Sequence, residues 1–450
     1  MDIKIQIILY ISIYILIMIG FSLALSCKQS KEDFLISGRN RSWWSIGMSK
    51  YATSIGASWF ISYTAYMYEF GMGVFLYALG YFIAMILLGY YIGPKIHKVS
   101  KKEGFMGLGD VVFYVSQSRT LAHIVDAFAS IALFAWLLVT VIGGANIIEF
   151  LGILSYEFSL LSIMLIVLIY VMNVGYKGVV TSDILQGGMI LFVLVLMAVS
   201  LIGDIDTQAI ASVSFDQMAF GTVAGFLIFG IFSAFPFVDR YQLLFSAKNE
   251  KEIKKGFLSV IPLILISVLL LMTMGYMLKL NMPNLDPSTA FIHAIQLYTP
   301  QALFPLVIVM FFAALMSTVD SLIHAFASNV GIFGIKDRVK NIRINAALIS
   351  ILVLIVCYFF RDIIHLTIFA VGFNLILSVP MIYVLFGKKW GETKKRPSRI
   401  ISSMFAGCIG FILGAFMIGF NDPTLALFPI IFGGFGLVFF SRFLDSYLSR

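Results

Sequence analysis

The chain has 450 residues, of which 60% are hydrophobic and 12% charged, and its mean hydropathy is +0.98. About a quarter of the residues of a soluble domain are charged, so this composition excludes a soluble globular protein and predicts a polytopic membrane protein. The net charge of +8 does not indicate nucleic-acid binding, because the basic residues are spread over short loops and form no single face.

Thirteen apolar runs are long enough to cross a bilayer. They lie near residues 5–26, 47–67, 71–93, 121–147, 153–173, 181–203, 219–241, 256–279, 301–333, 344–360, 363–386, 400–420 and 424–441. With the N-terminus outside, the inner segments, beginning with 28–50, hold 28 of the 31 Lys and Arg residues. Since basic residues favour the cytoplasmic side, the sequence predicts an outside N-terminus, a cytoplasmic C-terminus and a plasma-membrane location.

The second run, 47–67, carries an unusual number of hydroxyls around Gly56, among them Thr53, Ser54 and Ser58. A helix that is interrupted in mid-membrane frees backbone carbonyls, which can coordinate a cation. The alternative is a continuous helix whose Ser and Thr side chains bond back to their own backbone. The residues alone leave both interpretations open.

Two further runs contain polar residues where few are expected. The sixth run begins with Asp183, at its cytoplasmic end. The seventh, 219–241, contains several glycines and Pro236, which favour a kink or a break. It ends at Asp239 and Arg240, which are expected to form an ordinary surface pair.

The ninth run keeps polar side chains on one face of a helix. The face holds Ala314, Ser317, Thr318 and Ser321, with Asp320 and His324 beside it. A membrane helix with hydroxyls and a carboxylate on one face meets a cavity, an ion or a partner helix and not lipid. The run therefore predicts a cation site, whereas His324 is expected near the helix end, in the membrane interface.

Five stretches, in this order, resemble segments of the sodium:solute symporter family. They are DFLISGRNRSWWSIGMS, GASWFISYTAYMYEFG, GYKGVVTSDILQGG, DRYQLLFSAKNEKEIKKG and AALMSTVDSL. The resemblance covers about residues 5–440. It implies an all-α fold with the inverted-repeat (5+5) core of the leucine transporter over residues 47–386, preceded by residues 1–46, with the first helix and a loop, and followed by residues 387–450, with a basic linker and two helices.

The resemblance also implies which residues bind. A sodium ion would be held by the carbonyls of Ala57, Phe60 and Ala314 and the hydroxyls of Ser317 and Thr318. Asp183, Asp320 and Ser321, together with Ser317, would form a second sodium site or a release path. The solute would lie near Trp59, Tyr63, Phe229, Phe232 and Asn374. The fourth run lacks the Arg that binds the carboxylate in sialic acid transporters, which argues against that substrate.

These features predict a secondary transporter, with no catalytic residues, that couples sodium to a small organic solute by alternating access. An amino acid such as proline, a monocarboxylate, a vitamin and a sugar all remain open as solutes. The expected partners are sodium, the solute and the lipid bilayer, and the chain is expected to be a monomer. A proton-coupled carrier of the same fold and a transporter-like solute sensor remain alternatives, whereas the five dispersed histidines disfavour a membrane enzyme.

Overall fold

The computed structural model describes residues 3–26, 30–201, 218–330, 337–386, 390, 394–420 and 422–440. Within these ranges the chain is helical, which confirms the predicted all-α class, and one isolated β-bridge joins Arg41 to Ala247. The α-helices are α1 (Ile3–Ser26), α2 (Lys31–Ile36), α3 (Trp43–Ser54), α4 (Ala57–Phe70), α5 (Phe75–Ile86), α6 (Gly93–Glu103), α7 (Leu108–Ser116), α8 (Arg119–Phe150), α9 (Tyr156–Leu201), α11 (Phe220–Phe232), α12 (Val238–Ser246), α13 (Glu250–Asn281), α14 (Ala290–Tyr298), α15 (Phe304–Asn329), α16 (Arg338–Phe359), α17 (Ile363–Leu385), α18 (Pro397–Ile418) and α19 (Leu427–Phe435). Short 3₁₀ or π segments are η1 (Ser37–Arg39), η2 (Gly71–Val74), η3 (Leu87–Ile92), η4 (Pro287–Thr289), η5 (Pro423–Ala426) and η6 (Gly436–Phe440).

Each of the thirteen predicted spans corresponds to helical structure. Nine helices in the described part of the chain are long and apolar enough to cross a membrane. The lower number arises because 47–67 runs on into 71–93, and 153–173 into 181–203, while 219–241 and 424–441 form shorter helices. The segment between 71–93 and 121–147 contains a further short helix, α7.

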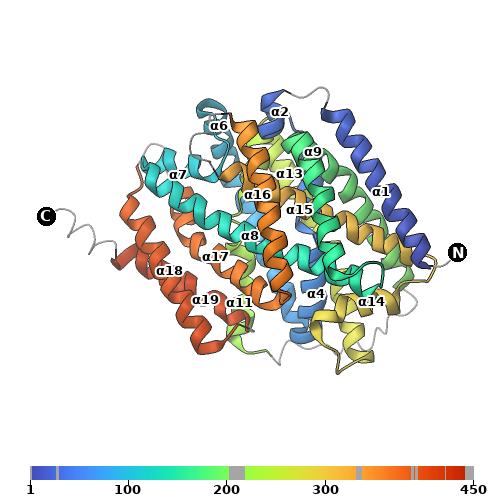
Figure 1. Ribbon diagram of the computed structural model, residues 1–450. Helices are drawn as coiled ribbons and strands as arrows, with labels where there is room; N and C mark the ends of the chain where they lie inside the picture. Colours follow the sequence, from blue (N-terminus) through green and yellow to red (C-terminus); the bar gives the residue numbers. More distant parts are fainter. Residues whose placement is uncertain are drawn as a thin grey trace.

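The helix at the centre of the molecule is α15. Of its apolar window 94% is buried, compared with 22% for α1, which lies at the edge of the molecule in Figure 1. It packs mainly against α8, α9 and α16, and it also contacts α1, α3, α4 and α12. This central place explains why its hydroxyls and carboxylate are tolerated, because none of them faces lipid.

Three helices are interrupted. The long helix α9 kinks at Gly175, where φ is 53° and a Cβ would overlap the Phe34 ring. The second run divides into α3 and α4 at Ile55 and Gly56. The seventh divides into α11 and α12 at residues 233–237, which contain Pro236, so the predicted break is confirmed.

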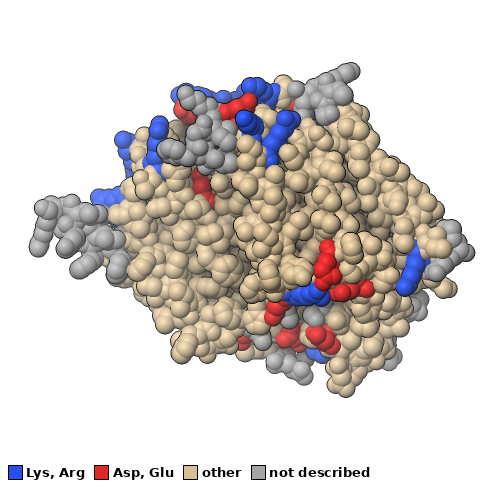
Figure 2. Space-filling view, viewed as in Figure 1, with Lys and Arg blue, Asp and Glu red and all other residues tan. Residues whose placement is uncertain are grey.

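Charged side chains gather at the two ends of the molecule. In Figure 2, Lys and Arg cover the end where Figure 1 labels α2 and α6, and a wide band without charge separates this basic end from a smaller mixed cluster opposite. Parts of the predicted basic linker, at 387–389 and 391–393, lie outside the described residues, as does the segment 442–450. The division of the chain at residues 47 and 386 stays a prediction.

Candidate functional site

The break between α3 and α4 exposes backbone groups deep inside the molecule. Ile55 ends α3 with φ −86° and ψ 55°, and Gly56 starts α4 in an extended conformation. The Gly56 carbonyl accepts hydrogen bonds from the amides of Trp59 and Phe60, at 3.0 and 3.2 Å. The Tyr51 carbonyl still accepts from the amide of Ile55 at 2.8 Å, whereas the carbonyls of Ala52, Thr53 and Ser54 are left without the helical amide partner four residues on. Of the two interpretations of this run, the interrupted helix is therefore correct. The residues that follow the break, including SYTAY at 62–66, lie within α4.

Helix α15 meets this break through Thr318. A Cβ on Gly56 would overlap the Thr318 hydroxyl, so only glycine lets the two helices approach this closely. The same hydroxyl donates to the Ala314 carbonyl at 3.0 Å. Of the five residues predicted to bind sodium, Ala57 and Phe60 lie in the first turn of α4, and the other three lie on α15, which contacts it.

Ser317 belongs both to the predicted sodium site and to the predicted second cation site. Its hydroxyl donates to Asp183 Oδ1 at 2.6 Å, and the Ser49 hydroxyl donates to Asp183 Oδ2 at 2.5 Å. Asp183 is fully buried, and its carboxyl group lies close enough to that of Asp320 for the two to interact electrostatically. The Ser321 hydroxyl lies 3.5 Å from that of Thr53, on the α3 side. Of the predicted second cation group, Ser317 and Asp320 thus lie near Asp183, whereas Ser321 is in contact with α3.

His324 is not an interface residue. It is fully buried, more than a turn before the end of α15 at Asn329. Its ring lies against Tyr176 and Phe34, at centroid distances of 5.2 and 6.5 Å. The expectation of a helix-end position is wrong because α15 continues past this point into the protein interior.

Asp239 and Arg240 are not a surface pair. Asp239 is 7% exposed and Arg240 is 5% exposed, because α12 turns inward after the break. Asp239 accepts a hydrogen bond from Lys50 Nζ at 2.8 Å, and Lys50 is itself 2% exposed. Lys50 was counted among the basic residues of the inner segment 28–50, but it lies on α3, one helical turn before the break. A buried ion pair thus joins the two interrupted helices.

Three neighbouring cavities, which share lining residues, lie beside the two breaks. The one next to the ion pair has a volume of about 60 Å³, a small one of about 10 Å³ follows, and a third of about 210 Å³ lies farther from the ion pair. Phe229 lines all three, and Trp59 lines the first two. Of the predicted solute-binding residues, Tyr63 lines the small cavity. Phe232 and Asn374 are absent from the lining that the described residues form.

Aromatic rings separate the first cavity from the third. Tyr77 stacks on Tyr63 at 5.6 Å and on Phe229 at 4.7 Å, and Trp59 contacts Tyr77 at 5.1 Å. The edge of Tyr81 meets Trp59 at 5.4 Å. Sequence reasoning missed Tyr77, Tyr81, Lys50 and the buried role of Arg240. The signal for Lys50 was its place three residues inside the apolar run that begins at 47.

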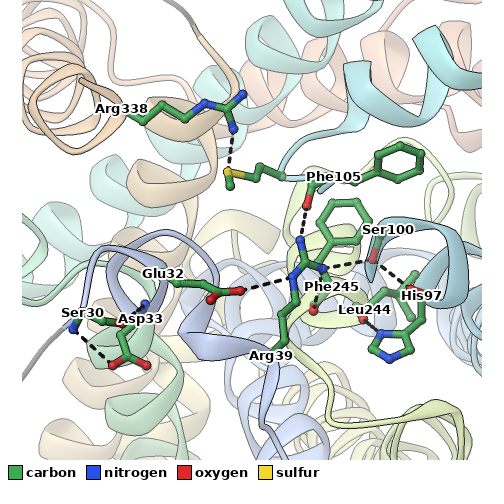
Figure 3. A network of polar contacts seen from close by, with 11 residues as sticks. Ser30, Glu32, Asp33, Arg39, His97, Ser100, Phe105, Leu244, Phe245 and Arg338 are labelled. Atoms are coloured by element: carbon green, nitrogen blue, oxygen red, sulfur yellow. Dashed lines mark hydrogen bonds and ion pairs between the residues drawn. The ribbon is translucent and has the colours of Figure 1, made fainter. Parts of the chain in front are cut away.

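A network of polar contacts lies at the basic end of the molecule (Figure 3). Arg39 donates to Ser100 Oγ at 3.1 Å and to the carbonyls of Phe105 and Phe245 at 2.9 and 3.4 Å. It also forms an ion pair with Glu32 at 3.5 Å. Burial lowers the pKa of the Arg39 guanidinium, and Glu32 partly offsets this. The network ties the segment before α3 to the end of α12, so both interrupted helices are anchored at the same end.

Comparison with known proteins agrees with this geometry. The model of the sodium:solute symporter family matches residues 34–358. A sodium/pantothenate symporter of Haemophilus influenzae is 25% identical over 361 residues, which cover 76% of this chain and 74% of that protein. A sodium/glucose cotransporter of Vibrio parahaemolyticus is 26% identical over 211 residues, covering 44% of this chain and 37% of that protein.

Solved structures show the same fold at low sequence identity. A Na⁺-coupled sialic acid symporter in a substrate-bound outward-open state superimposes with a TM-score of 0.80 at 15% identity, covering 98% of each chain. Mhp1, a nucleobase-cation-symport-1 family transporter, gives 0.62 at 13% identity, covering 94% of this chain and 96% of its own. At such identities the likeness concerns the fold alone. The family match over most of the length carries the assignment: this chain belongs to the sodium:solute symporter family, and it is a transporter with sodium as its coupling ion, not an enzyme.

Proposed function

We propose that this chain carries sodium and a small organic solute together across the plasma membrane by alternating access. The observation that carries the proposal is the contact between Gly56, at the break of α3 and α4, and Thr318 on α15. At this contact the break, where carbonyls at the end of α3 lack a helical amide partner, meets a buried hydroxyl, and such oxygens suit a hard cation.

Sodium would be held by neutral oxygens alone. The ligands we propose are the carbonyls of Ala57, Phe60 and Ala314 and the hydroxyls of Ser317 and Thr318. Since none of these groups carries a charge, the ion would bind only moderately, which suits an ion that must be released in every cycle. The Thr318 hydroxyl lies close to the break, as this role requires.

Asp183, Asp320 and Ser321 form the second group in the proposal. They would hold a second sodium ion or guide the first one out. The support is the contact of Ser317 with Asp183 at 2.6 Å, which joins the two groups through one hydroxyl. An ion that leaves the neutral group would therefore meet a buried carboxylate next.

The solute would bind in the cavities beside the breaks, against Trp59, Tyr63 and Phe229. An amino acid, a monocarboxylate, a vitamin such as pantothenate, and a sugar are the classes that the relatives' names and the family leave open. All of the proposed binding residues come from one chain, so a monomer suffices. The basic end in Figure 2 supports a cytoplasmic position for that end, with the N-terminus outside.

The test is a thermal-stability screen of the purified chain against a metabolite panel, in sodium or in choline, followed by uptake into proteoliposomes. We expect sodium alone to raise the melting temperature, and one class of solute to raise it further only when sodium is present. Uptake of that solute should then stop when choline replaces sodium. Uptake that continues in choline and follows a proton gradient would instead support the proton-coupled alternative.

A further inference from the structure

The cavity between the two breaks carries more positive than negative charge. Its volume is about 60 Å³, and the charged residues in its lining are Lys50, Asp239 and Arg240. They are 2%, 7% and 5% exposed. Lys50 and Arg240 are cations and Asp239 is an anion, and the buried carboxyl of Asp183 also interacts with Lys50. Positive charge therefore remains unbalanced at Arg240, which is unfavourable in the protein interior. An anionic occupant would balance it.

Of the two cations in the lining, Arg240 is the one without a carboxylate as ion-pair partner among the described residues. Lys50 pairs with Asp239 at 2.8 Å, whereas Arg240 donates from Nη1 to the Ser233 carbonyl at 3.1 Å and lies over the Phe237 ring, 4.6 Å from its centroid. Its Nε is buried without a hydrogen-bond partner, and no carboxylate among the described residues forms an ion pair with it. A guanidinium with unused donors matches the two oxygens of a carboxylate.

The remaining lining suits an apolar or planar body. The aromatic side chains of Trp59, Tyr77 and Phe229 line the cavity and the small one that follows it. Beyond them lies the cavity of about 210 Å³, whose lining is mostly apolar. A neutral sugar would leave the excess charge unbalanced. A cationic solute could use the rings, but Lys50 and Arg240 would repel it.

We propose that the solute is a small organic carboxylate, whose charged group binds Arg240 with Lys50 beside it and whose body lies against Trp59 and Tyr77. This inference rests on the proposed symport function and names its substrate class. Thr318 lines the same cavity, so a sodium ion bound there adds positive charge near the carboxylate. Sodium and carboxylate should therefore strengthen each other's binding by the same factor.

Pairs of a carboxylate and its amide test whether the negative charge of the ligand is needed for binding. The purified full-length chain in nanodiscs is heated in sodium or potassium chloride with acetate or acetamide, isovalerate or isovaleramide, and phenylacetate or phenylacetamide. Glucose and choline are the neutral and cationic comparisons. We expect at least one carboxylate to raise the melting temperature in sodium and not in potassium, and its amide to have no effect.

Three variants test the residue. Arg240→Gln should weaken the apparent affinity for the effective carboxylate by about 100-fold, because it removes a charged donor. Arg119→Gln is the control: Arg119 also lies near a Phe ring, 5.7 Å from the centroid of Phe113, but it is exposed. Asp239→Asn raises the net positive charge and should leave carboxylate affinity equal or higher. If Arg240 and Asp239 only support the structure of the cavity, both Arg240→Gln and Asp239→Asn should lower the affinity for the carboxylate.

The outcomes separate the two proposals. The carboxylate inference is overturned if no carboxylate stabilises the chain in sodium, since acetate is small enough to enter, or if amides or glucose act equally well. It is also overturned if Arg240→Gln binds the carboxylate as the wild type does. In each of these cases a melting temperature that rises with sodium leaves the symport proposal standing. A chain that responds neither to sodium nor to any probe would contradict both.

Discussion

The two interrupted helices differ in what their breaks offer to a ligand. Between α3 and α4 the break is short, and its neighbours are hydroxyls and the contact of Gly56 with Thr318. Between α11 and α12 five residues are non-helical, and Asp239 and Arg240 follow at once. Neutral oxygens suit a cation that must leave again, whereas a fixed positive charge suits an anion. In our proposals the coupling ion therefore binds at the first break, and the charged group of the solute binds at the second.

The two breaks are nevertheless joined. Lys50, on the helix before the first break, pairs with Asp239 after the second. Thr318 and Arg240 line the same cavity from opposite helices. A change at one break should therefore be felt at the other, and the size of that effect measures how strongly sodium and solute are coupled.

Gly56→Ala should have the largest effect. The new methyl group would overlap the Thr318 hydroxyl, so α15 and the first break would be forced apart. We expect sodium-dependent uptake to be abolished and the rise of the melting temperature with sodium to disappear. The control is Gly188→Ala on α9, where a Cβ meets nothing within 4 Å and uptake should be unchanged. Normal sodium dependence in Gly56→Ala would break the assignment of the ion to the first break.

Lys50→Met should have the next largest effect, on stability. It leaves Asp239 buried without its cation, which destabilises proteins by about 3–5 kcal/mol. The double variant Lys50→Met with Asp239→Leu removes both charges and should recover most of that loss. Chemical denaturation of the wild type, the single variant and the double variant measures the free energy of unfolding of each. Equal destabilisation by the single and double variants would show that the link between the breaks depends on packing and not on charge.

Thr318→Ala should raise the sodium concentration needed for half-maximal uptake by roughly 10-fold, since one oxygen ligand is lost. Thr318→Ser keeps the hydroxyl and is the matched control. Ser317→Ala should raise it as well, and it also leaves Asp183 Oδ1 without its donor. If both Ala variants keep the wild-type sodium requirement, the ion does not bind at these hydroxyls.

Much of this comparison could be predicted from the sequence, because its causes are local. Apolar runs define the helices, and glycine and proline mark where they are interrupted, so Gly56 and Pro236 indicated both breaks. The stripe of α15 was visible because helical periodicity places Ser317 and Thr318 on one face. Trp59, which is predicted to bind the solute, lines two of the cavities.

The ion pair could not be predicted, because its partners are 189 residues apart and one sequence carries no information on distant pairing. Lys50 looked like a topology anchor, and Asp239 and Arg240 looked like loop residues, since each stands near the end of an apolar run. The direction of the chain after Pro236 decides that both enter the interior. That direction depends on tertiary packing, and for the same reason Phe232 and Asn374 were expected in a cavity that they do not line.

Asp183→Asn should change transport less than Thr318→Ala, and in a different way. The amide oxygen can still accept from one of the Ser49 and Ser317 hydroxyls, and the amide nitrogen can donate to the oxygen of the other, so the fold and sodium binding should persist. The charge that we propose an ion meets on release is gone. We expect a severalfold fall in the maximal rate with little change in the sodium requirement, measured as separate kinetic constants. Wild-type values of both would remove Asp183 from the release path.

The smallest effect is expected at Asp33, which lies ahead of the first break and lines no described cavity. Asp33 and Ser30 cap α2 reciprocally, and Lys177 donates to Asp33 Oδ2 at 3.2 Å. Burial alone would raise the pKa of Asp33, but the Ser30 amide and Lys177 hold it below its ordinary value. Ionised Asp33 therefore stabilises the fold at neutral pH, and this contribution is lost as the pH falls through the unfolded and then the folded pKa.

Asp33→Asn should accordingly lower the free energy of unfolding by about 0.5–1 kcal/mol at neutral pH and by less in acid, where the wild type has lost the same charge. Uptake per folded molecule, the sodium requirement and carboxylate affinity should all stay at wild-type values, because neither break is touched. Lys177→Met is the matched change from the other side of the contact and should give a similar loss. A shift in the sodium requirement in either variant would contradict this expectation. It would mean that the segment before α3 controls the first break directly, through its attachment to α9. Stability and ion binding could then not be separated at this end of the molecule.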